Sequence, residues 1–437
     1  MAETLHSGTV LTRLQRIAEL ARAHPERAFH SIHHAIDVDL LREAYRRTRK
    51  SGAPGIDGET AAQFASQLEV RLEALLEKLR TGVYRAPPVR RVHIPKGDGS
   101  KTRPIGIPTF EDKVLQRAVT MVLEAIYEQD FHPGSFGFRP GRSAHQALQA
   151  VWELLMEMNG GWVVEVDIEA FFDSMDHSHL KGFLDRRVTD GTLRRAIHKW
   201  LRAGVLEGGA THHPEHGTPQ GGVISPLLAN VYLHEVLDVW FETEVKPRLR
   251  GRAELIRYAD DFVIVCKHEE DARRVFDVLP KRFARFGLRL HPAKTRVVRF
   301  ERPQDRRQEP RPETFDLLGL THYWGVSRKG NLVVRRKTAK SRLSRAITAI
   351  RRWCRDHRHV ALPLQHKHLS AKLRGHYNYY GITGNMRSLV AVRYHAMMAW
   401  WKWLQRRNHR PFRWAAFAAL LARLPLPPPR IVRSSLG

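Results

Sequence analysis

The sequence predicts an α+β fold, in which a mixed unit with antiparallel strands is followed by an all-helical basic region. Short apolar runs within residues 89–107 and 254–266 enclose tight turns, a pattern typical of β-hairpins. Apolar residues at helical spacing within residues 63–79 predict a packed helix in the same unit. A further helical stripe after residue 340 predicts the helical region at the basic end.

The beginning of the chain predicts a small helical extension. Leu11, Leu14 and Ile17 recur at helical spacing, and the Gly- and Pro-containing residues 51–58 end the pattern. A second break is the polar, Arg- and Pro-rich segment 301–313, where we expect a linker or a surface insertion.

The charge of the chain indicates a polyanionic partner. There are 73 Lys plus Arg against 45 Asp plus Glu, which gives a formal net charge of +28. About +22 of this charge lies after residue 331, where 23 basic residues accompany the single acid Asp356 and many Trp and Tyr residues. A solvated charged face would mix both signs, so this pattern predicts that a nucleic acid docks mainly there.

Membrane and disulfide classes are not indicated. No apolar run is long enough to cross a membrane, and the first residues lack the apolar core of a secretory signal. Cys266 and Cys354 can form neither a disulfide framework nor a four-ligand zinc site. We therefore expect a soluble protein of a reducing cytosol, without a membrane partner.

Acidic residues stand at the ends of predicted strands. Asp167 ends the apolar run 161–167, and Asp260 and Asp261 lie at the tip of the second hairpin. Adjacent carboxylates repel each other, and a bound cation offsets that repulsion. Carboxylate and phosphate oxygens are ligands of Mg²⁺, and two such ions can activate a hydroxyl and stabilise a leaving pyrophosphate. For an isolated Asp-Asp pair, an exposed turn is the alternative.

The tetrapeptide Tyr258-Ala-Asp-Asp261 is similar to the catalytic motif of reverse transcriptases, in the variant common to group II intron-encoded proteins. Further motifs of this family follow in order within roughly residues 40–420. They are RPIGIP at 103–108, SFGFRPGR at 135–142, VDIEAFFD at 166–173, GTPQGGVISPLLAN at 217–230, HPAKT at 291–295, FDLLGL at 315–320 and GHYNYYG at 375–381. The chain thus resembles a bacterial group II intron-encoded reverse transcriptase and maturase.

This resemblance implies a right-hand polymerase, with fingers and an antiparallel palm sheet, followed by an all-helical thumb or maturase domain. It also implies a place in the bacterial cytoplasm, associated with the nucleoid. No endonuclease motif follows residue 411, so nicking of target DNA is not expected of this chain. The implied segments are an N-terminal helical extension at 1–60, fingers at 61–150, a palm with the active site at 151–325, a thumb or maturase domain at 326–410 and a short basic tail at 411–437.

The same resemblance implies roles for individual residues. Asp167 and Asp260 are expected to bind two Mg²⁺ ions, with the carbonyl of Ile168 as a further ligand and Asp261 completing the acidic site. Phe172 is expected to exclude the 2′-hydroxyl of a ribonucleotide and so to select dNTPs; ordinary core packing is the alternative. The other expected nucleotide contacts are Lys96, Arg103, Gln220 and Lys294. Lys294 either protonates the leaving pyrophosphate or is a surface cation. The expected primer grip is Leu318 and Gly319.

The basic region is expected to bind RNA. Leu343, Ile347, Ile350 and Cys354 mark one apolar helical stripe, and arginines lie largely outside it. By resemblance, such helices grip the template-primer duplex and also bind structured intron RNA. The expected RNA-binding residues are Arg351, Arg352, Arg374, Tyr377, Tyr379, Arg406 and Arg407.

The expected function is RNA-directed DNA synthesis by an enzyme that also binds its intron RNA to assist splicing and mobility. Its partners would be structured intron RNA, an RNA template with a DNA primer, dNTPs and target DNA. Two alternatives stay open: an RNA-binding splicing factor with a vestigial polymerase, and a domesticated or host-defence reverse transcriptase without an intron. The presence of all three aspartates favours an active polymerase over the splicing factor.

Overall fold

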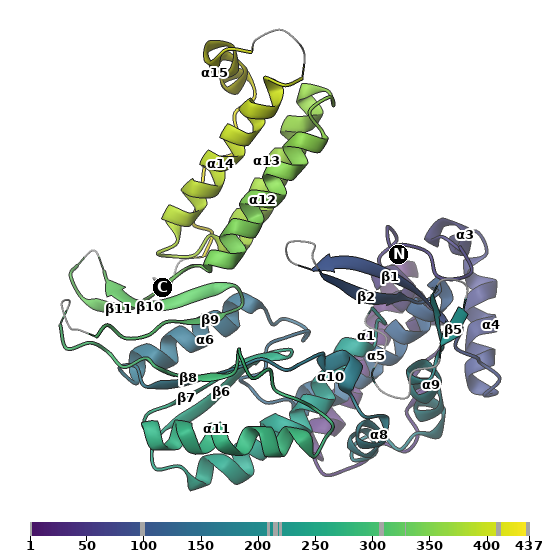
Figure 1. Ribbon diagram of the computed structural model, residues 1–437. Coiled ribbons are helices and arrows are strands. Elements are labelled where there is room, and N and C mark those ends of the chain that lie inside the picture. Colours follow the sequence, from purple (N-terminus) through teal and green to yellow (C-terminus); the bar gives the residue numbers. More distant parts are fainter. Residues whose placement is uncertain are drawn as a thin grey trace. The chain divides into compact units, whose positions relative to one another are not determined.

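The chain folds into two compact units, which a computed structural model describes for residues 2–96, 101–207, 210–212, 217, 221–305, 310–327, 329–407 and 412–433. The first unit comprises residues 1–147 and 166–296, and the second comprises residues 148–165 and 297–437. Helices and mainly antiparallel strands occur together, which confirms the predicted α+β class (Figure 1). The division into five segments remains a prediction.

The first unit begins with helices packed on α5 (Phe110–Asp130), which is buried along most of its length. Its partners are α1 (Ala2–Ala23) and α2 (Val38–Arg47), and α2 starts where the Asp37 side chain accepts a hydrogen bond from the Leu40 amide. The other helices of this unit are η1 (His33–Ala35), α3 (Ala61–Ala65), α4 (Leu68–Arg80), α7 (Phe171–Ser174), α8 (His177–Asp185), α9 (Gly191–Leu201), α10 (Ser225–Leu233), η2 (His234–Asp238), η3 (Phe241–Val245), η4 (Lys246–Arg248) and α11 (Glu269–Ala284).

The single helix predicted over residues 63–79 is wrong, because the segment forms two helices, α3 and α4. Thr60 and Gln63 cap the start of α3 reciprocally. Gln67, between the two helices, has φ −132° and ψ 40°, which is not a helical conformation. The apolar spacing continues across the break because both helices bury apolar residues, among them Phe64 in α3 and Leu72 in α4.

Two hairpins of the first unit are confirmed. β1 (Val89–Lys96) pairs with β2 (Lys101–Ile107) in the order β2-β1-β4-β5, where β4 is Val205–Glu207 and β5 is Ala210–His212. β6 (Ala253–Tyr258) pairs with β7 (Asp261–Cys266), and Tyr258 stands opposite Asp261 at the turn. Helix α11 packs against β7, which is buried after its first residue.

The second unit combines short strands with a helical bundle. Its strands are β3 (Trp162–Val166), beside β8 (Arg296–Arg299), and a sheet in the order β11-β10-β9, formed by β9 (Phe315–Leu317), β10 (Leu320–Val326) and β11 (Leu332–Thr338). Its helices are α6 (Ala144–Glu157), which starts in the first unit, α12 (Lys340–Asp356), α13 (Leu362–Tyr380), α14 (Met386–Leu404) and α15 (Trp414–Arg423). Helices α12, α13 and α14 run side by side (Figure 1). No helix in the described part of the chain is long and apolar enough to cross a membrane.

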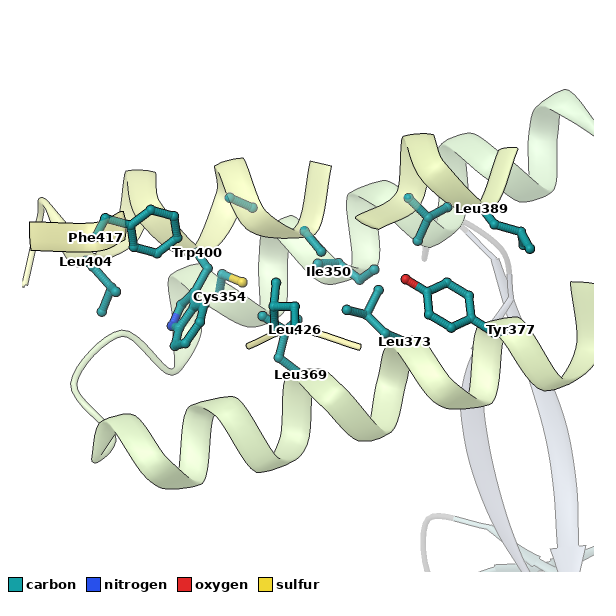
Figure 2. Close-up of a cluster of buried hydrophobic side chains, with 13 residues drawn as sticks. Ile350, Cys354, Leu369, Leu373, Tyr377, Leu389, Trp400, Leu404, Phe417 and Leu426 are labelled. Atoms are coloured by element: carbon teal, nitrogen blue, oxygen red, sulfur yellow. The ribbon is translucent and has the colours of Figure 1, made fainter. Parts of the chain in front are cut away.

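The helical bundle has a core of its own. Side chains from α12, α13 and α14 meet in one cluster that includes Ile350, Leu369 and Trp400 (Figure 2). The Trp400 indole donates a hydrogen bond to the side-chain oxygen of Gln365 at 2.9 Å, so its polar nitrogen is satisfied inside the core. The predicted apolar stripe of α12 is confirmed, since Ile350 and Cys354 are buried there and Leu343 and Ile347 pack against them.

The sheet of the second unit contains a fully buried histidine. His322 stacks on Phe315 with ring centroids 4.6 Å apart and stands opposite Arg336 on β11. Burial, together with the charge of Arg336, lowers the pKa of His322 to about 3, and backbone contacts at Leu320 and Phe315 offset this only in part. The ring is therefore neutral in the folded chain.

We predict that this histidine makes folding pH-dependent. His322 stays neutral in the folded chain above about pH 3, whereas in the unfolded chain it binds a proton below about pH 6.5. Its burial therefore does not lower the free energy of unfolding above about pH 6.5. This free energy should fall by about 1.4 kcal/mol per pH unit as the pH drops from about 6.5 toward 3. Urea unfolding across this range should show that the free energy of unfolding changes less steeply with pH for His322→Phe than for the wild type. The exposed His359, in the matched variant His359→Phe, should keep the wild-type slope.

Candidate active site

The turn of the β6–β7 hairpin presents the two adjacent aspartates. Ala259 is buried and has a left-handed backbone with φ 57°, an unusual conformation for a residue with a side chain. Gly137 passes so close to it that a Cβ atom on Gly137 would collide with the Ala259 amide nitrogen. The glycine of the SFGFRPGR motif is therefore needed where that segment crosses the acidic turn.

A buried ion pair lies beneath this turn. Arg257 is 0% exposed, and its guanidinium donates to both carboxylate oxygens of Asp238 at 2.9 and 2.6 Å. The same guanidinium donates to the side-chain oxygen of Asn230 and to the Ala259 carbonyl, each at 3.0 Å. The Asn230 amide in turn donates to the Gly137 carbonyl at 2.7 Å. The network thus ties the left-handed residue of the turn to two other segments.

The backbone of β6 also pairs with the segment before Gly137. The Arg257 amide donates to the Gly134 carbonyl at 2.9 Å, and the Phe136 amide donates to the Arg257 carbonyl at 2.8 Å. Burial alone would raise the pKa of Asp238, but the charge of Arg257 and hydrogen bonds from His234 and Arg257 hold this pKa below its ordinary value. Asp238 is therefore ionised at neutral pH.

Asp167 follows β3 and is held by the segment that contains the HPAKT motif. Its carbonyl accepts a hydrogen bond from the His291 amide at 2.8 Å. The Lys294 ammonium lies 2.8 Å from a carboxylate oxygen of Asp167, in a pair whose side chains are both about half exposed. Ile168 is buried and bridges to Leu290. Two sequence motifs that are more than a hundred residues apart therefore meet at Asp167.

Asp260 lies within electrostatic reach of Asp167. The pKa of Asp260 is raised, first because the carboxyl is buried and also because of the negative charge of Asp167. Its own backbone amide and the charges of Arg103 and Arg257 offset this only in part. A cation bound between the two carboxylates would relieve both effects, so these residues fit a divalent metal ion.

Asp261 behaves differently from Asp260. It is the first residue of β7 and is exposed, whereas Asp260 is partly buried. Among the described residues, no three His, Cys, Asp or Glu side chains form a group that could hold a metal ion. The structure thus places Asp260 within electrostatic reach of Asp167, and the role of Asp261 at this site stays a prediction.

The expected nucleotide contacts are partly described. Arg103 is exposed on β2 opposite Ile94, and its charge reaches Asp260. Phe172 is half-buried in α7 with its ring 5.4 Å from Phe171, which is in the core. Gln220 and the side chain of Lys96 lie outside the described residues.

Gly217, the first residue of the GTPQ motif, supports Phe172. A Cβ atom on Gly217 would lie 2.7 Å from the Phe172 carbonyl oxygen, and its φ is 85°. The Gly217 amide donates to the Met175 carbonyl at 2.8 Å. The backbone that carries Phe172 therefore packs directly on the start of that motif.

The expected RNA contacts divide into exposed and buried residues. Arg351, Arg352, Arg374 and Arg406 are exposed on the helical bundle, and Arg407 is partly buried. The expectation that Tyr377 contacts RNA is wrong, because this residue is 1% exposed in the core of the bundle and its hydroxyl donates to the Pro427 carbonyl. Tyr379 is half-buried, and its hydroxyl donates to the Leu318 carbonyl at 2.9 Å. The expected primer grip, Leu318 and Gly319, forms the turn between β9 and β10.

Sequence reasoning missed the ion pair beneath the acidic turn. Arg257 interrupts the apolar strand 254–258, and a charged residue at an inward position requires a partner. That signal was present in the sequence. Its partner Asp238 lies in a π-helical turn that has no sequence signature, so the pairing could not be assigned.

Comparisons with known proteins identify the family of the chain. A family model described as reverse transcriptase (RNA-dependent DNA polymerase) matches residues 94–322. Protein YkfC of Escherichia coli (strain K12) is 39% identical over 260 residues, which cover 52% of this chain and 68% of that protein. The group II intron-encoded protein LtrA of Lactococcus lactis subsp. cremoris is 39% identical over 228 residues, which cover 51% of this chain and 37% of that protein. Nuclear intron maturase 2 of Arabidopsis thaliana is 31% identical and covers 31% of this chain and 24% of its own length.

We predict that the ion pair is needed for folding. Arg257→Met should lower the free energy of unfolding by about 3 to 5 kcal/mol, because it leaves a buried carboxylate without a partner. Thermal and urea unfolding measure this loss. Arg273→Gln is the matched control, since Arg273 forms an exposed ion pair with Glu269 and its loss should change stability little. Equal losses in both variants would contradict a structural role for the buried pair.

Proposed function

Because the chain belongs to the reverse transcriptase (RNA-dependent DNA polymerase) family, we propose that it extends a DNA primer on an RNA template and also binds a group II intron RNA. The observation that carries the polymerase proposal is that the buried Asp260 carboxyl interacts electrostatically with both Asp167 and Arg103. Two carboxylates beside a cation suit the transfer of a nucleotide from a triphosphate. We further propose the right-hand arrangement, with the helical bundle as thumb.

Asp167 and Asp260 would hold Mg²⁺, with Asp261 and the Ile168 carbonyl as further ligands. Two bound Mg²⁺ ions would activate the primer 3′-hydroxyl and stabilise the departing pyrophosphate. The fit rests on the raised pKa of Asp260, which burial and the charge of Asp167 cause and which a cation would reverse.

Other residues of the site would bind and select the nucleotide. Arg103 is exposed, its charge reaches Asp260, and its forked guanidinium can hold a triphosphate. Phe172, whose backbone carbonyl packs on Gly217, would occupy the space of a 2′-hydroxyl and so exclude ribonucleotides. Lys294, which forms an ion pair with Asp167, would donate a proton to the leaving pyrophosphate.

The proposal for RNA binding rests on the charge of the helical bundle. Its apolar residues are inside, and Arg351, Arg352, Arg374 and Arg406 are exposed outside. Because the chain after residue 331 has 23 basic residues and a single acid, this surface attracts phosphates. LtrA is a group II intron-encoded protein by name, and by this similarity we propose intron RNA as the ligand, with assistance to splicing and mobility.

The polymerase proposal predicts that Asp260→Asn abolishes primer extension with Mg²⁺. The substitution keeps the size of the side chain but removes a charge that stabilises the ions, so the rate should fall by at least about a hundredfold. Extension of a DNA primer on an RNA template by the purified chain measures it, with EDTA as a second means of removing the metal. Asp277→Asn, which changes an exposed aspartate of α11, is the control and should keep the wild-type rate. Primer extension by Asp260→Asn at the wild-type rate would contradict the proposed metal site.

The RNA proposal predicts a change in salt dependence. Replacing the exposed Arg351, Arg352, Arg374 and Arg406 with Gln should weaken binding of a structured group II intron RNA. It should also reduce the log-log salt slope by roughly three, since each lost phosphate contact removes about 0.7 to 0.9. Primer extension on a short template at saturating concentration should persist, because the aspartates are unchanged.

A matched variant separates location from charge. Arg248, Arg274, Lys281 and Arg285 line a cavity of about 520 Å³ beside α11 in the first unit, and their replacement with Gln removes the same charge. This control should keep most of the wild-type slope. If both variants lose slope equally, RNA binding follows net charge, and the helical bundle is not its specific surface.

A further inference from the structure

The turn between β9 and β10 has an unusual backbone. Its two residues, Leu318 and Gly319, have φ angles of 51° and 77°, both in the left-handed region. Such a pair is typical of a tight two-residue hairpin turn. Glycine adopts this conformation freely, but leucine does not, so the surrounding structure must hold Leu318 in place.

The end of helix α13 supplies the holding contacts. The Tyr379 hydroxyl donates to the Leu318 carbonyl at 2.9 Å. The next residue, Tyr380, lies under Gly319, where an added Cβ atom would come 3.1 Å from the Tyr380 hydroxyl and 3.3 Å from Cγ of Arg342. The Gly319 carbonyl accepts a hydrogen bond from the Ala339 amide at 3.0 Å. Both carbonyls of the turn are thus bound by segments that begin or end helices.

Asn385 locks these segments together. Its side-chain amide donates to the Tyr380 carbonyl and to the Thr338 hydroxyl, each at 2.8 Å, and its oxygen accepts from the Thr338 amide at 2.8 Å. Asn385 is 1% exposed. The end of α13 and the end of β11 therefore cannot shift independently, and the turn is held from both sides.

From this geometry we propose that Tyr379 is a positioning residue for the primer and not an RNA contact. Its hydroxyl fixes the Leu318 carbonyl and thereby the turn that holds the primer end. The inference rests on the proposed polymerase function and on the expectation from the sequence that Leu318 and Gly319 grip the primer. The helical bundle then has two roles: its outer arginines bind RNA, and the end of α13 sets the turn.

The proposal gives Tyr379 a specific kinetic effect. A primer 3′-hydroxyl that is poorly aligned reacts slowly, although the nucleotide still binds. Tyr379→Phe keeps the ring and its packing against Tyr380, whose centroid is 4.8 Å away, and removes only the hydroxyl. The rate constant for the first nucleotide addition should therefore fall about two- to tenfold, the range for one neutral hydrogen bond. The dNTP concentration for half-maximal rate, the active-site titre and the intron RNA affinity should stay unchanged.

The experiment is single-turnover extension of a DNA primer on an RNA template, with RNA affinity measured in parallel. Tyr394→Phe is the matched control, since Tyr394 is an exposed tyrosine on α14 of the same unit. Gly319→Ala is a second route to the same defect, because it displaces the turn without changing Tyr379. If both act through the turn, the double variant should be slowed by less than the product of the two single effects.

The outcomes separate this inference from the proposed function. A wild-type chain that extends no primer would contradict the polymerase proposal itself. Wild-type extension with an unchanged rate constant in Tyr379→Phe would overturn only the positioning role. Weaker RNA binding by Tyr379→Phe would support the direct RNA contact expected from the sequence and would also overturn the positioning role. A lower active-site titre with an unchanged rate constant would indicate a merely structural role, again against the inference.

Discussion

The acidic turn depends on a guanidinium that is shielded from water. Removing Arg257 and Asp238 from water is costly, and only good geometry with further hydrogen bonds offsets this. Here Asp238, Asn230 and the Ala259 carbonyl all accept hydrogen bonds from Arg257. Because one of these acceptors is the left-handed residue next to Asp260, the ion pair also fixes the backbone that carries the aspartates.

This constraint explains why several short motifs of the chain occur together. The SFGFRPGR segment supplies Gly137, the GTPQGGVISPLLAN segment supplies Asn230, and the acidic hairpin supplies Arg257. Each motif contributes one part of a single buried network, so a change in one affects the others. Lys294 and Asp167 join the HPAKT segment to VDIEAFFD in the same way, although through an exposed ion pair that contributes less to stability.

Local patterns in the sequence predicted what depends on neighbours along the chain. Both hairpins and the position of Asp167 after a strand followed from apolar spacing and turns. The break at Gln67 was not predicted, because the apolar spacing of two helices runs on across the two residues between them, Ser66 and Gln67. The aromatic residues of the basic region were interpreted as partners of RNA, yet Tyr377 and Trp400 are core residues. Spacing alone could not tell these roles apart, since a stacking platform and a helical core use the same side chains.

The closed core of the helical bundle has an evolutionary consequence. Because Ile350, Leu369, Trp400 and their neighbours complete that core, the exposed arginines around it have little part in folding. Substitutions on this outer surface can accumulate one at a time under selection, because they disturb neither the fold nor the arrangement of the aspartates. With the proposed roles of the two units, a lineage of such proteins can therefore change the RNA that it binds while the proposed polymerase site stays the same.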